Sequence, residues 1–320
     1  IALQTALIVA LIGRSLGWSW GSAFAIAPWA AILVQQCLEP FNQSVGFAQV
    51  NTAMMALVMI DVAAPPSWKG RGVASGLAAA IKLTPAIAVL IFLLRRQWRS
   101  AITMVTTSVA VTLLGCIISK DESASFFIYA MWDPQRAGDP YYTSNQNLKG
   151  FVSRALPENA WSITWAIAVV LALVAAVWLC LRIQAAATPA VPVLPENLAT
   201  LLTAAVIMTL GLLVSPITWS HHWVWGLASV VVLIAVALRL KSAPLAAVAL
   251  VQGALFIMAP HWWFSHGQVN ELHWNVVEQL VGSSYTLAAI ASGVALAWAL
   301  PVQATARLGW NSLRRTNAPI

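Results

Sequence analysis

Charged side chains are scarce in this 320-residue chain: they make up 8% of it, whereas hydrophobic residues make up 60%. A soluble domain carries about 25% charged residues, so the composition excludes that class. The hydrophobic residues form continuous runs instead of alternating with polar ones, which argues against a membrane β-barrel. The sequence therefore predicts an all-α polytopic membrane protein.

Cysteine and nucleotide-binding motifs are also in short supply. The three cysteines, Cys37, Cys116 and Cys180, lie in or beside apolar runs at spacings that suit neither a metal site nor a disulfide framework. No Walker or Rossmann pattern is present. The net charge of +7 comes from basic residues in short loops, which indicates membrane topology and not nucleic-acid binding. The chain begins at Ile1 inside an apolar run, so we expect further sequence before it.

The apolar runs predict about ten transmembrane helices, each close to the length that crosses ~30 Å of hydrocarbon. They divide the chain into an N-terminal transmembrane module (1–119), an extracytoplasmic loop (120–160) and a C-terminal transmembrane module (161–320). The runs fall at 1–13, 20–37, 45–62, 73–94, 100–119, 161–181, 198–214, 222–240, 243–260 and 279–300.

The charged residues orient these runs, because short cytoplasmic loops are rich in lysine and arginine. If every run from 73 onward crosses once, one side receives the basic residues Arg95, Arg96, Arg99, Arg182, Arg239, Lys241, Arg307, Arg314 and Arg315. The opposite, outward side receives all five histidines and eight of the ten acids, Asp61 among them. Arg14 is the exception, because it falls on the outward side.

Two adjacent histidines stand in the polar turn Ser215-Pro-Ile-Thr-Trp-Ser-His-His222 between two apolar runs. Histidine has the intrinsic pKa of a general base near neutral pH, so His221 and His222 are candidate catalytic residues. Trp219 in the same turn could stack on a sugar. The alternative is a plain interfacial turn, since tryptophan is enriched at that depth.

A second exception to the apolar pattern is Lys82, near the middle of the run 73–94 and followed by Pro85. A lysine at the centre of a bilayer costs about 2.5–3.5 kcal/mol on insertion scales, and charges there are usually functional. We therefore expect Lys82 to bind an anion or a phosphate. A lysine paired with a neighbouring helix is the alternative. Arg71 and Lys149 are further candidates for binding the same anion, although Arg71 could equally be an ordinary interfacial residue.

Amide side chains gather on the predicted outward face, where they could bind sugar hydroxyls. They occur in two stretches, one around 42–51 and one at 144–148 in the long outward loop. Arg154, after the second stretch, could hold a phosphate or cap a helix. The amide candidates for substrate binding are Asn42, Gln49, Asn51, Asn145, Gln146 and Asn147.

These motifs, in this order, resemble glycosyltransferase family 87, whose members are integral-membrane GT-C-type enzymes. The specific pieces are Ile81-Lys-Leu-Thr-Pro85 and the Ser215–His222 turn, and the resemblance covers roughly 40–275. Asn42-Gln-x-x-x-Gly-x-x-Gln-Val-Asn51 and Ser144-Asn-Gln-Asn-Leu148 are weaker. The resemblance is greatest to the mannosyltransferases that build mycobacterial phosphatidylinositol mannosides.

The resemblance implies a function. It implies transfer of a mannosyl unit from polyprenyl-phosphate-mannose to a hydroxyl of a lipid-anchored mannoside of the phosphatidylinositol mannoside type, with inversion, on the extracytoplasmic face of the plasma membrane. The partners would be that donor, a glycolipid acceptor and membrane lipids. Family members usually carry an essential acid in the first outward loop, which would lie upstream of Ile1 and could serve as the general base.

Three other functions remain open from the residues. Arabinofuranose could replace mannose as the transferred unit. A transporter or flippase would need polar residues along a path to both faces, whereas the polar residues here gather on one face. A purely structural membrane subunit would not explain Lys82 beside Pro85. The histidine spacings match no zinc motif, so we expect no metal and no cofactor, with a weak divalent cation at Asp133 or Asp139 left open.

Overall fold

A computed structural model describes residues 1–131, 133, 136, 138–187 and 193–301 of the chain. These residues form helices and contain no β-strand, apart from one isolated antiparallel bridge between Asn145 and Trp219. The all-α prediction is therefore confirmed. Arg307, Arg314 and Arg315 lie outside the described residues.

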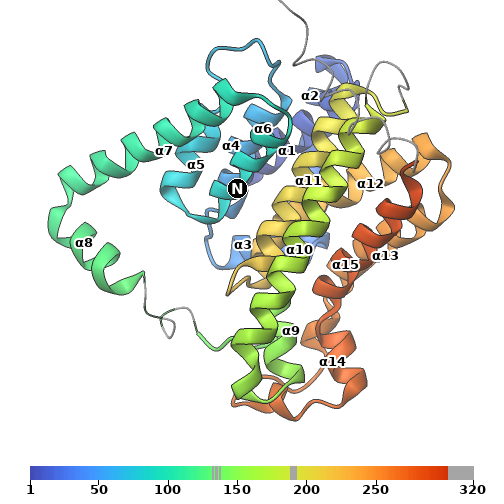
Figure 1. The fold of residues 1–320 in the computed structure, drawn as a ribbon. Coiled ribbons are helices and arrows are strands. Elements are labelled where there is room, and N and C mark those ends of the chain that lie inside the picture. The colour runs from blue at the N-terminus through green and yellow to red at the C-terminus, as the bar shows by residue number, and fades with distance from the viewer. Residues whose placement is uncertain (132, 134–135, 137, 188–192, 302–320) are drawn as a thin grey trace, which may run out of the picture.

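The helices follow one another through the whole described chain (Figure 1). The first half contains α1 (Ala2–Ser15), α2 (Trp20–Cys37), α3 (Glu39–Gly46), α4 (Asn51–Ala63), α5 (Val73–Ile81), the 3-10 helix η1 (Thr84–Ala88), α6 (Val89–Leu94), α7 (Trp98–Ile118), α8 (Lys120–Ser125) and the π-helix η2 (Phe126–Ala130). The second half contains α9 (Leu148–Ala155), α10 (Glu158–Ala186), α11 (Glu196–Val214), η4 (Ser220–Trp225), α12 (Gly226–Leu240), α13 (Ala243–Met258), η5 (Pro260–Trp262), η6 (Asn270–His273), α14 (Val276–Gly282) and α15 (Ser284–Ala299).

Four helical segments of the described chain are long and apolar enough to cross a membrane: α7, α10, α11 and the continuous stretch Ser220–Leu240. Two bent pairs raise the number to six if each is one span, α2 with α3 at 83° and α14 with α15 at 71°. The remaining apolar helices have 10–17 residues. The predicted count of about ten spans is therefore not confirmed and stays a prediction.

The two ends of the helix bundle differ in chemistry. At one end, which we call the histidine end, Lys82 contacts Asn51 and His222, and His261 approaches Glu39. At the other, which we call the basic end, Arg95 forms an ion pair with Glu196, and Arg99 donates to the Lys69 carbonyl. Helix α9 and helix α14, at the bottom of Figure 1, lie at the histidine end.

The run 73–94 is not a single crossing. Helix α5 enters from the basic end and stops at Lys82, whose backbone is extended; η1 turns the chain, and α6 returns to the same end. The return is shown by Gly72, where an added Cβ would lie 2.4 Å from the Ser100 carbonyl at the start of α7. The expectation of one crossing was wrong, because hydropathy reports the length of an apolar run and not whether it reverses.

This hairpin corrects the predicted sides of two charged residues. Asp61 lies at the basic end and not on the histidine side, because Arg71 Nε donates to the Asp61 carbonyl at 2.7 Å. Arg14 also lies at the basic end, beside Ser15, whose carbonyl accepts from the Asn197 amide. Arg14 is therefore no exception to the charge pattern, and both errors arose from counting the hairpin as a span.

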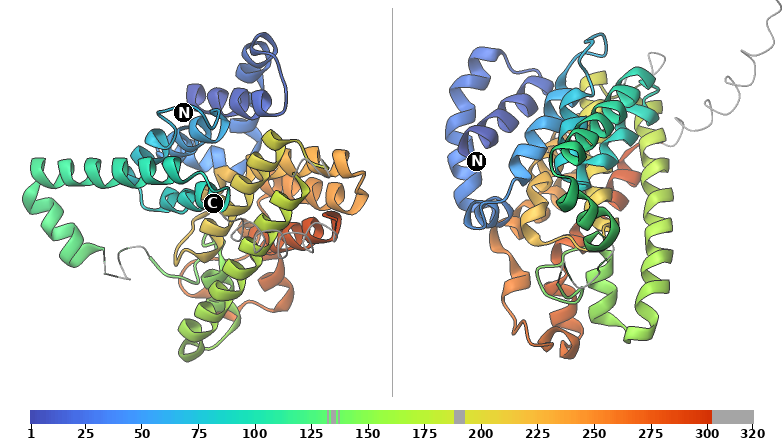
Figure 2. Two further views of the ribbon diagram at one scale, coloured as in Figure 1. Left: turned by 45° about the horizontal axis from the view of Figure 1, so that its top comes forward. Right: turned by 90° about the vertical axis from the view of Figure 1, so that its left-hand side faces the viewer.

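Helix α11 is the centre of the bundle, because 78% of its most apolar 18-residue stretch is buried inside the protein. One large hydrophobic core surrounds it and includes side chains from helices as far apart in the chain as α1 and α15. In helix α7 only 11% of the corresponding stretch is buried. Figures 1 and 2 show α7 and α8 extending away from the other helices. The position of α11 matters for function, because the histidine turn follows its last residue.

Candidate active site

The histidine turn begins where α11 cannot continue. Helix α11 ends at Val214, and Ser215 adopts an extended conformation before Pro216, as the residue before a proline usually does. The chain then re-enters a 3-10 helix, η4, that carries His221 and His222 and leads directly into α12. Two histidines are thereby fixed between two rigid helices rather than on a free loop.

Lys82 is the cation of this site. Its Nζ donates to Asn51 Oδ1 at 2.8 Å and lies 3.2 Å from His222 Nε2. An ammonium has three donors and no acceptor, so His222 Nε2 must accept. Among the described residues no carboxylate lies within 4.0 Å of Lys82, and its third donor has no partner. The geometry therefore leaves one N–H of a half-buried cation for an anionic ligand.

His221 is held by its backbone. Its carbonyl oxygen accepts from both Ser44 Oγ and Asn51 Nδ2 at 2.9 Å, which ties the turn to α3 and α4. The ring lies 4.6 Å from the His222 ring and 5.3 Å from the Phe47 ring. Asn51 thus links His221 to Lys82, because its amide nitrogen donates to the His221 carbonyl and its amide oxygen accepts from Lys82. Asn51 is the predicted amide residue that lies in this cluster.

Glu39 is a largely buried acid that joins four segments of the histidine end. Its Oε1 accepts from Ser220 Oγ at 2.6 Å and from Trp262 Nε1 at 3.0 Å, and its Oε2 accepts from the Tyr285 hydroxyl at 3.0 Å. His261 Nε2 lies 3.7 Å from Oε1. Because Ser220 directly precedes the histidine pair, Glu39 fixes the start of the turn against α3, η5 and α15.

His261 completes that acid cluster and is fully buried. Burial lowers the pKa of His261, and the neighbouring Glu39 carboxylate opposes that change. A buried histidine at neutral pH is therefore largely uncharged, and its place beside Glu39, Trp262 and Tyr285 is that of a packed core residue. No group of three or more metal-ligating side chains occurs within the described ranges.

The amide stretch at 145–147 clamps the histidine turn. Asn145 Oδ1 accepts from the Thr218 backbone N–H at 2.8 Å, and Asn147 Nδ2 donates to the Ser215 carbonyl at 2.6 Å. Gln146 bonds to the backbone of Thr143, Gly282 and Tyr285. All three amides are fully buried and make these bonds within the protein. A contact of Asn145, Gln146 or Asn147 with substrate stays a prediction.

Arg154 organises the loop beneath that clamp. Its Nη1 donates to the carbonyls of Tyr141, Tyr142 and Asn145, and its Nη2 donates to Ser283 Oγ at 2.9 Å. Burial lowers the pKa of Arg154 to about 9, so the guanidinium keeps its charge at neutral pH. Its donors tie one loop to the junction of α14 and α15, and a contact of Arg154 with a phosphate stays a prediction.

The other predicted substrate residues, all of which the structure describes, make no side-chain hydrogen bond to Lys82, His221 or His222, although the Trp219 carbonyl accepts from the His222 backbone N–H, and their contacts with substrate stay predictions. Asn42 is exposed on α3, and Gln49 is partly exposed in the turn before α4. Lys149 Nζ lies over the Trp165 ring at 5.1 Å, and the Trp219 ring lies 5.9 Å from that of Tyr142. Arg71 is buried at the basic end, and the nine-residue helix α5, about 14 Å long, separates it from Lys82.

Sequence reasoning missed Glu39. It stands directly before Pro40 at the start of α3, where an acid favours a helix N-terminus and draws no further notice. Its partners Ser220, Trp262 and Tyr285 are 181, 223 and 246 positions away in the chain. The only signal available was an acid inside a chain that has ten.

Long apolar helices that place a lysine, two histidines and a largely buried acid at one end of a bundle define a polytopic membrane protein with a polar site at that end. The model of glycosyltransferase family 87 matches residues 1–216, which include α1–α11 and Lys82. The chain belongs to glycosyltransferase family 87.

Curated relatives come from mycobacteria. The chain is 31% identical over 269 residues to the polyprenol-phosphate-mannose-dependent alpha-(1-2)-phosphatidylinositol mannoside mannosyltransferase of Mycobacterium tuberculosis, covering 82% of this chain and 60% of that protein. It is 32% identical over 269 residues to the protein of the same name from Mycolicibacterium smegmatis, covering 83% and 58%. A phosphatidylinositol pentamannoside mannosyltransferase of M. tuberculosis is 30% identical over 205 residues, covering 63% and 44%.

The chain thus spans about 60% of the length of the curated relatives it matches. No solved structure matches it. The family is therefore established from sequence, and the arrangement of the site comes from the contacts described above.

Proposed function

We propose that this protein transfers a mannosyl unit from polyprenyl-phosphate-mannose to a hydroxyl of a lipid-anchored mannoside of the phosphatidylinositol mannoside type. The observation that carries the proposal is the free donor on Lys82, half-buried among Asn51 and His222 at the rim of a membrane protein. A polyprenyl phosphate presents its negative charge at that depth while its chain stays in the bilayer. The names of the relatives supply the donor and the class of acceptor.

The histidine end is the extracytoplasmic end in this proposal, and the membrane is the plasma membrane. The basic end carries Arg14, Lys69, Arg71, Arg95 and Arg99, and short loops rich in lysine and arginine stay in the cytoplasm. Placing Arg14 and the hairpin ends there makes the charge asymmetry stronger than the sequence alone suggested.

The proposed reaction is a displacement at the anomeric carbon. The acceptor hydroxyl oxygen forms the new bond, the bond between that carbon and the phosphate oxygen breaks, and its electron pair leaves with the prenyl phosphate. Attack from the face opposite the leaving group inverts the configuration. Lys82 stabilises the charge that grows on the phosphate, which is the largest contribution that such sites usually make. We propose that the reaction uses no cofactor, with Lys82 supplying the positive charge.

The acceptor hydroxyl must lose its proton as it attacks, and we propose His221 as the group that receives it or that positions that hydroxyl. Lys82 occupies His222 Nε2, whereas neither ring nitrogen of His221 has a hydrogen-bond partner among the described residues; Nδ1 is buried, so Nε2 is the nitrogen that would meet the hydroxyl. His222 therefore acts mainly by positioning Lys82.

The test is a transfer assay with labelled polyprenyl-phosphate-mannose in membranes that contain the full-length protein. We expect His221→Ala to lower the rate about 100-fold or more, as loss of a general base does. His273→Ala, which changes an exposed histidine at the same end, should leave the rate unchanged. A wild-type rate for His221→Ala removes His221 from its role. Transfer from an arabinofuranosyl donor and not from the mannosyl donor would reassign the sugar.

A further inference from the structure

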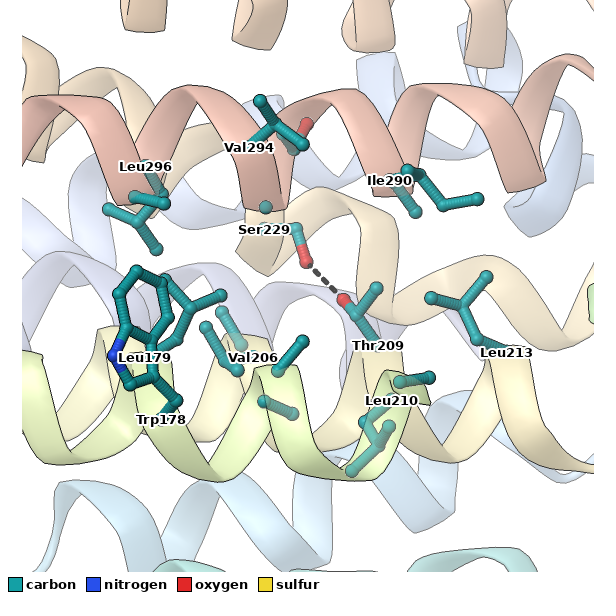
Figure 3. A pocket seen from close by; sticks show the side chains of 18 of the residues that line it. Trp178, Leu179, Val206, Thr209, Leu210, Leu213, Ser229, Ile290, Val294 and Leu296 are labelled. Atoms are coloured by element: carbon teal, nitrogen blue, oxygen red, sulfur yellow. Dashed lines mark hydrogen bonds between the residues drawn. The ribbon is translucent and has the colours of Figure 1, made fainter. Parts of the chain in front are cut away.

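An apolar cavity of about 450 Å³ lies between α10, α11, α12 and α15 (Figure 3). Alanine, leucine and valine side chains form most of its wall, and none of its lining residues is charged. The polar side chains in the wall bond to one another: Thr209 with Ser229 at 3.0 Å, and Ser292 with Gln252 at 3.1 Å. The volume is that of a ligand site, and the wall suits hydrocarbon rather than a sugar or a phosphate.

Helix α11 separates this cavity from the Lys82 cluster. Leu210 and Leu213 line the cavity, and Figure 3 shows both on the helix that forms one of its walls. Gly211 lies on the opposite side of α11, where an added Cβ would meet the Ile87 side chain of the hairpin at 2.9 Å. A ligand in the cavity and a phosphate at Lys82 would therefore lie on two sides of one helix.

The cavity also runs along α11 toward the histidine end. Its lining on α11 extends from Leu202 to Leu213, about 16 Å at 1.5 Å per residue. Leu148 closes the wall at the histidine end, one residue after Asn147, whose amide holds the Ser215 carbonyl of the histidine turn. At the opposite end of the cavity, the Ala297 carbonyl accepts a hydrogen bond from Arg182 Nη1. A chain in this cavity would carry its polar head toward the histidine turn.

We propose that this cavity binds an acyl chain of the glycolipid acceptor. The inference rests on the proposed function, which requires two lipid-borne substrates to bring their heads together. The donor phosphate at Lys82 starts its prenyl chain on the hairpin side of α11, so the cavity on the other side is left for the acceptor. The two chains then approach the histidine turn from opposite sides of one helix without crossing.

The cavity can be filled at Gly293 on α15. An added Cβ there has Leu179 Cδ1 as its nearest neighbour at 3.9 Å, an ordinary contact, so the Cβ of Gly293→Phe fits and its ring would occupy cavity space. We expect the KM for the glycolipid acceptor to rise about tenfold, equivalent to unburying about two methylenes. The KM for the prenyl donor should change less than about twofold by the same reasoning.

The matched control is Ala291→Phe, two residues away on the exposed side of α15 and outside the cavity lining, which should change neither KM. Ala172→Phe fills the same cavity from α10 and guards against a folding defect in the first variant. A rise in the donor KM alone would assign the cavity to the prenyl chain and overturn the proposal. Unchanged KM values in both filled variants would also overturn it.

Direct binding separates this inference from the proposed function. An acceptor glycolipid with a diazirine in its acyl chain should crosslink to α10 or α15 in the wild type, and Gly293→Phe should abolish that crosslink while Ala291→Phe keeps it. If the wild type fails to transfer mannose but this pattern holds, the proposed reaction fails and the cavity assignment stands. If transfer occurs and the crosslinks fall elsewhere, the cavity assignment fails alone.

Discussion

Replacing Lys82 by methionine should lower the rate of mannosyl transfer by at least about 100-fold, because loss of one donor to a developing negative charge costs 10²–10³ in rate. Methionine keeps the length and apolar stem of the side chain but removes all three donors. Asn51 Oδ1 and His222 Nε2 would lose their partner, yet both residues line a space of about 20 Å³, which is large enough for one water. The effect should therefore fall on catalysis and donor binding more than on folding.

The measurement is the transfer rate at saturating acceptor, with the thermal midpoint of the purified variant recorded beside it. Lys120→Met serves as the control, since Lys120 is exposed at the start of α8, which extends away from the other helices. Its rate should equal that of the wild type. A Lys82→Met variant that is folded and transfers at the wild-type rate would show that the leaving phosphate is stabilised elsewhere.

Replacing Glu39 by alanine should destabilise the protein and abolish transfer together. The change leaves the donors of Ser220, Trp262 and Tyr285 without their acceptor, and each buried unsatisfied group costs about 1–3 kcal/mol. The sum lowers the thermal midpoint by roughly 5–15 °C. Loss of the Ser220 contact also frees the start of the histidine turn, so His221 and His222 lose their fixed position.

Thermal unfolding in detergent and the transfer rate test this together. Glu39→Gln preserves the shape and one acceptor oxygen, so it should fall between wild type and Glu39→Ala in both measurements. Glu158→Ala is the control, because it changes an exposed acid at the start of α10, and its thermal midpoint should equal that of the wild type. If Glu39→Ala unfolds at the wild-type temperature, the acid does not hold the four segments together.

Lys82 and the histidine pair could be found from the sequence because each is a polar or charged group within or between long apolar runs. A lysine inside an apolar run and two histidines between two such runs need a physical reason, and the structure brings Lys82 and His222 into contact. The helices themselves were equally accessible, since apolar runs longer than about 18 residues have few other interpretations.

The hairpin 73–94 could not be recognised in the same way. Its length is that of a span, and the evidence for a reversal was limited to Thr84 and Pro85, which begin η1. Proline in a membrane helix more often bends the helix than reverses the chain, so a single crossing was the simplest interpretation. The error then moved Asp61 and Arg14 to the wrong end, because topology errors propagate along the chain.

The acid cluster and the amide clamp depend on long-range packing. Asn145 meets Thr218 and Gln146 meets Tyr285 across 73 and 139 positions, and no local pattern encodes those pairings. Amides on an outward loop suggested sugar binding, whereas their buried bonds to backbone groups explain their presence without a ligand. Glu39 was overlooked for the same reason, since its hydrogen-bond partners are distant in the sequence and only the folded structure brings them together.

The proposed function requires the histidine end to face outward, and cysteine labelling in intact cells tests this most directly. In a background with Cys37, Cys116 and Cys180 changed to serine, single cysteines would replace His273 at the histidine end and Lys69 at the basic end, both exposed. A membrane-impermeant maleimide should label His273→Cys in intact cells and Lys69→Cys only after permeabilisation. The reverse pattern would place the Lys82 site in the cytoplasmic leaflet and contradict the account.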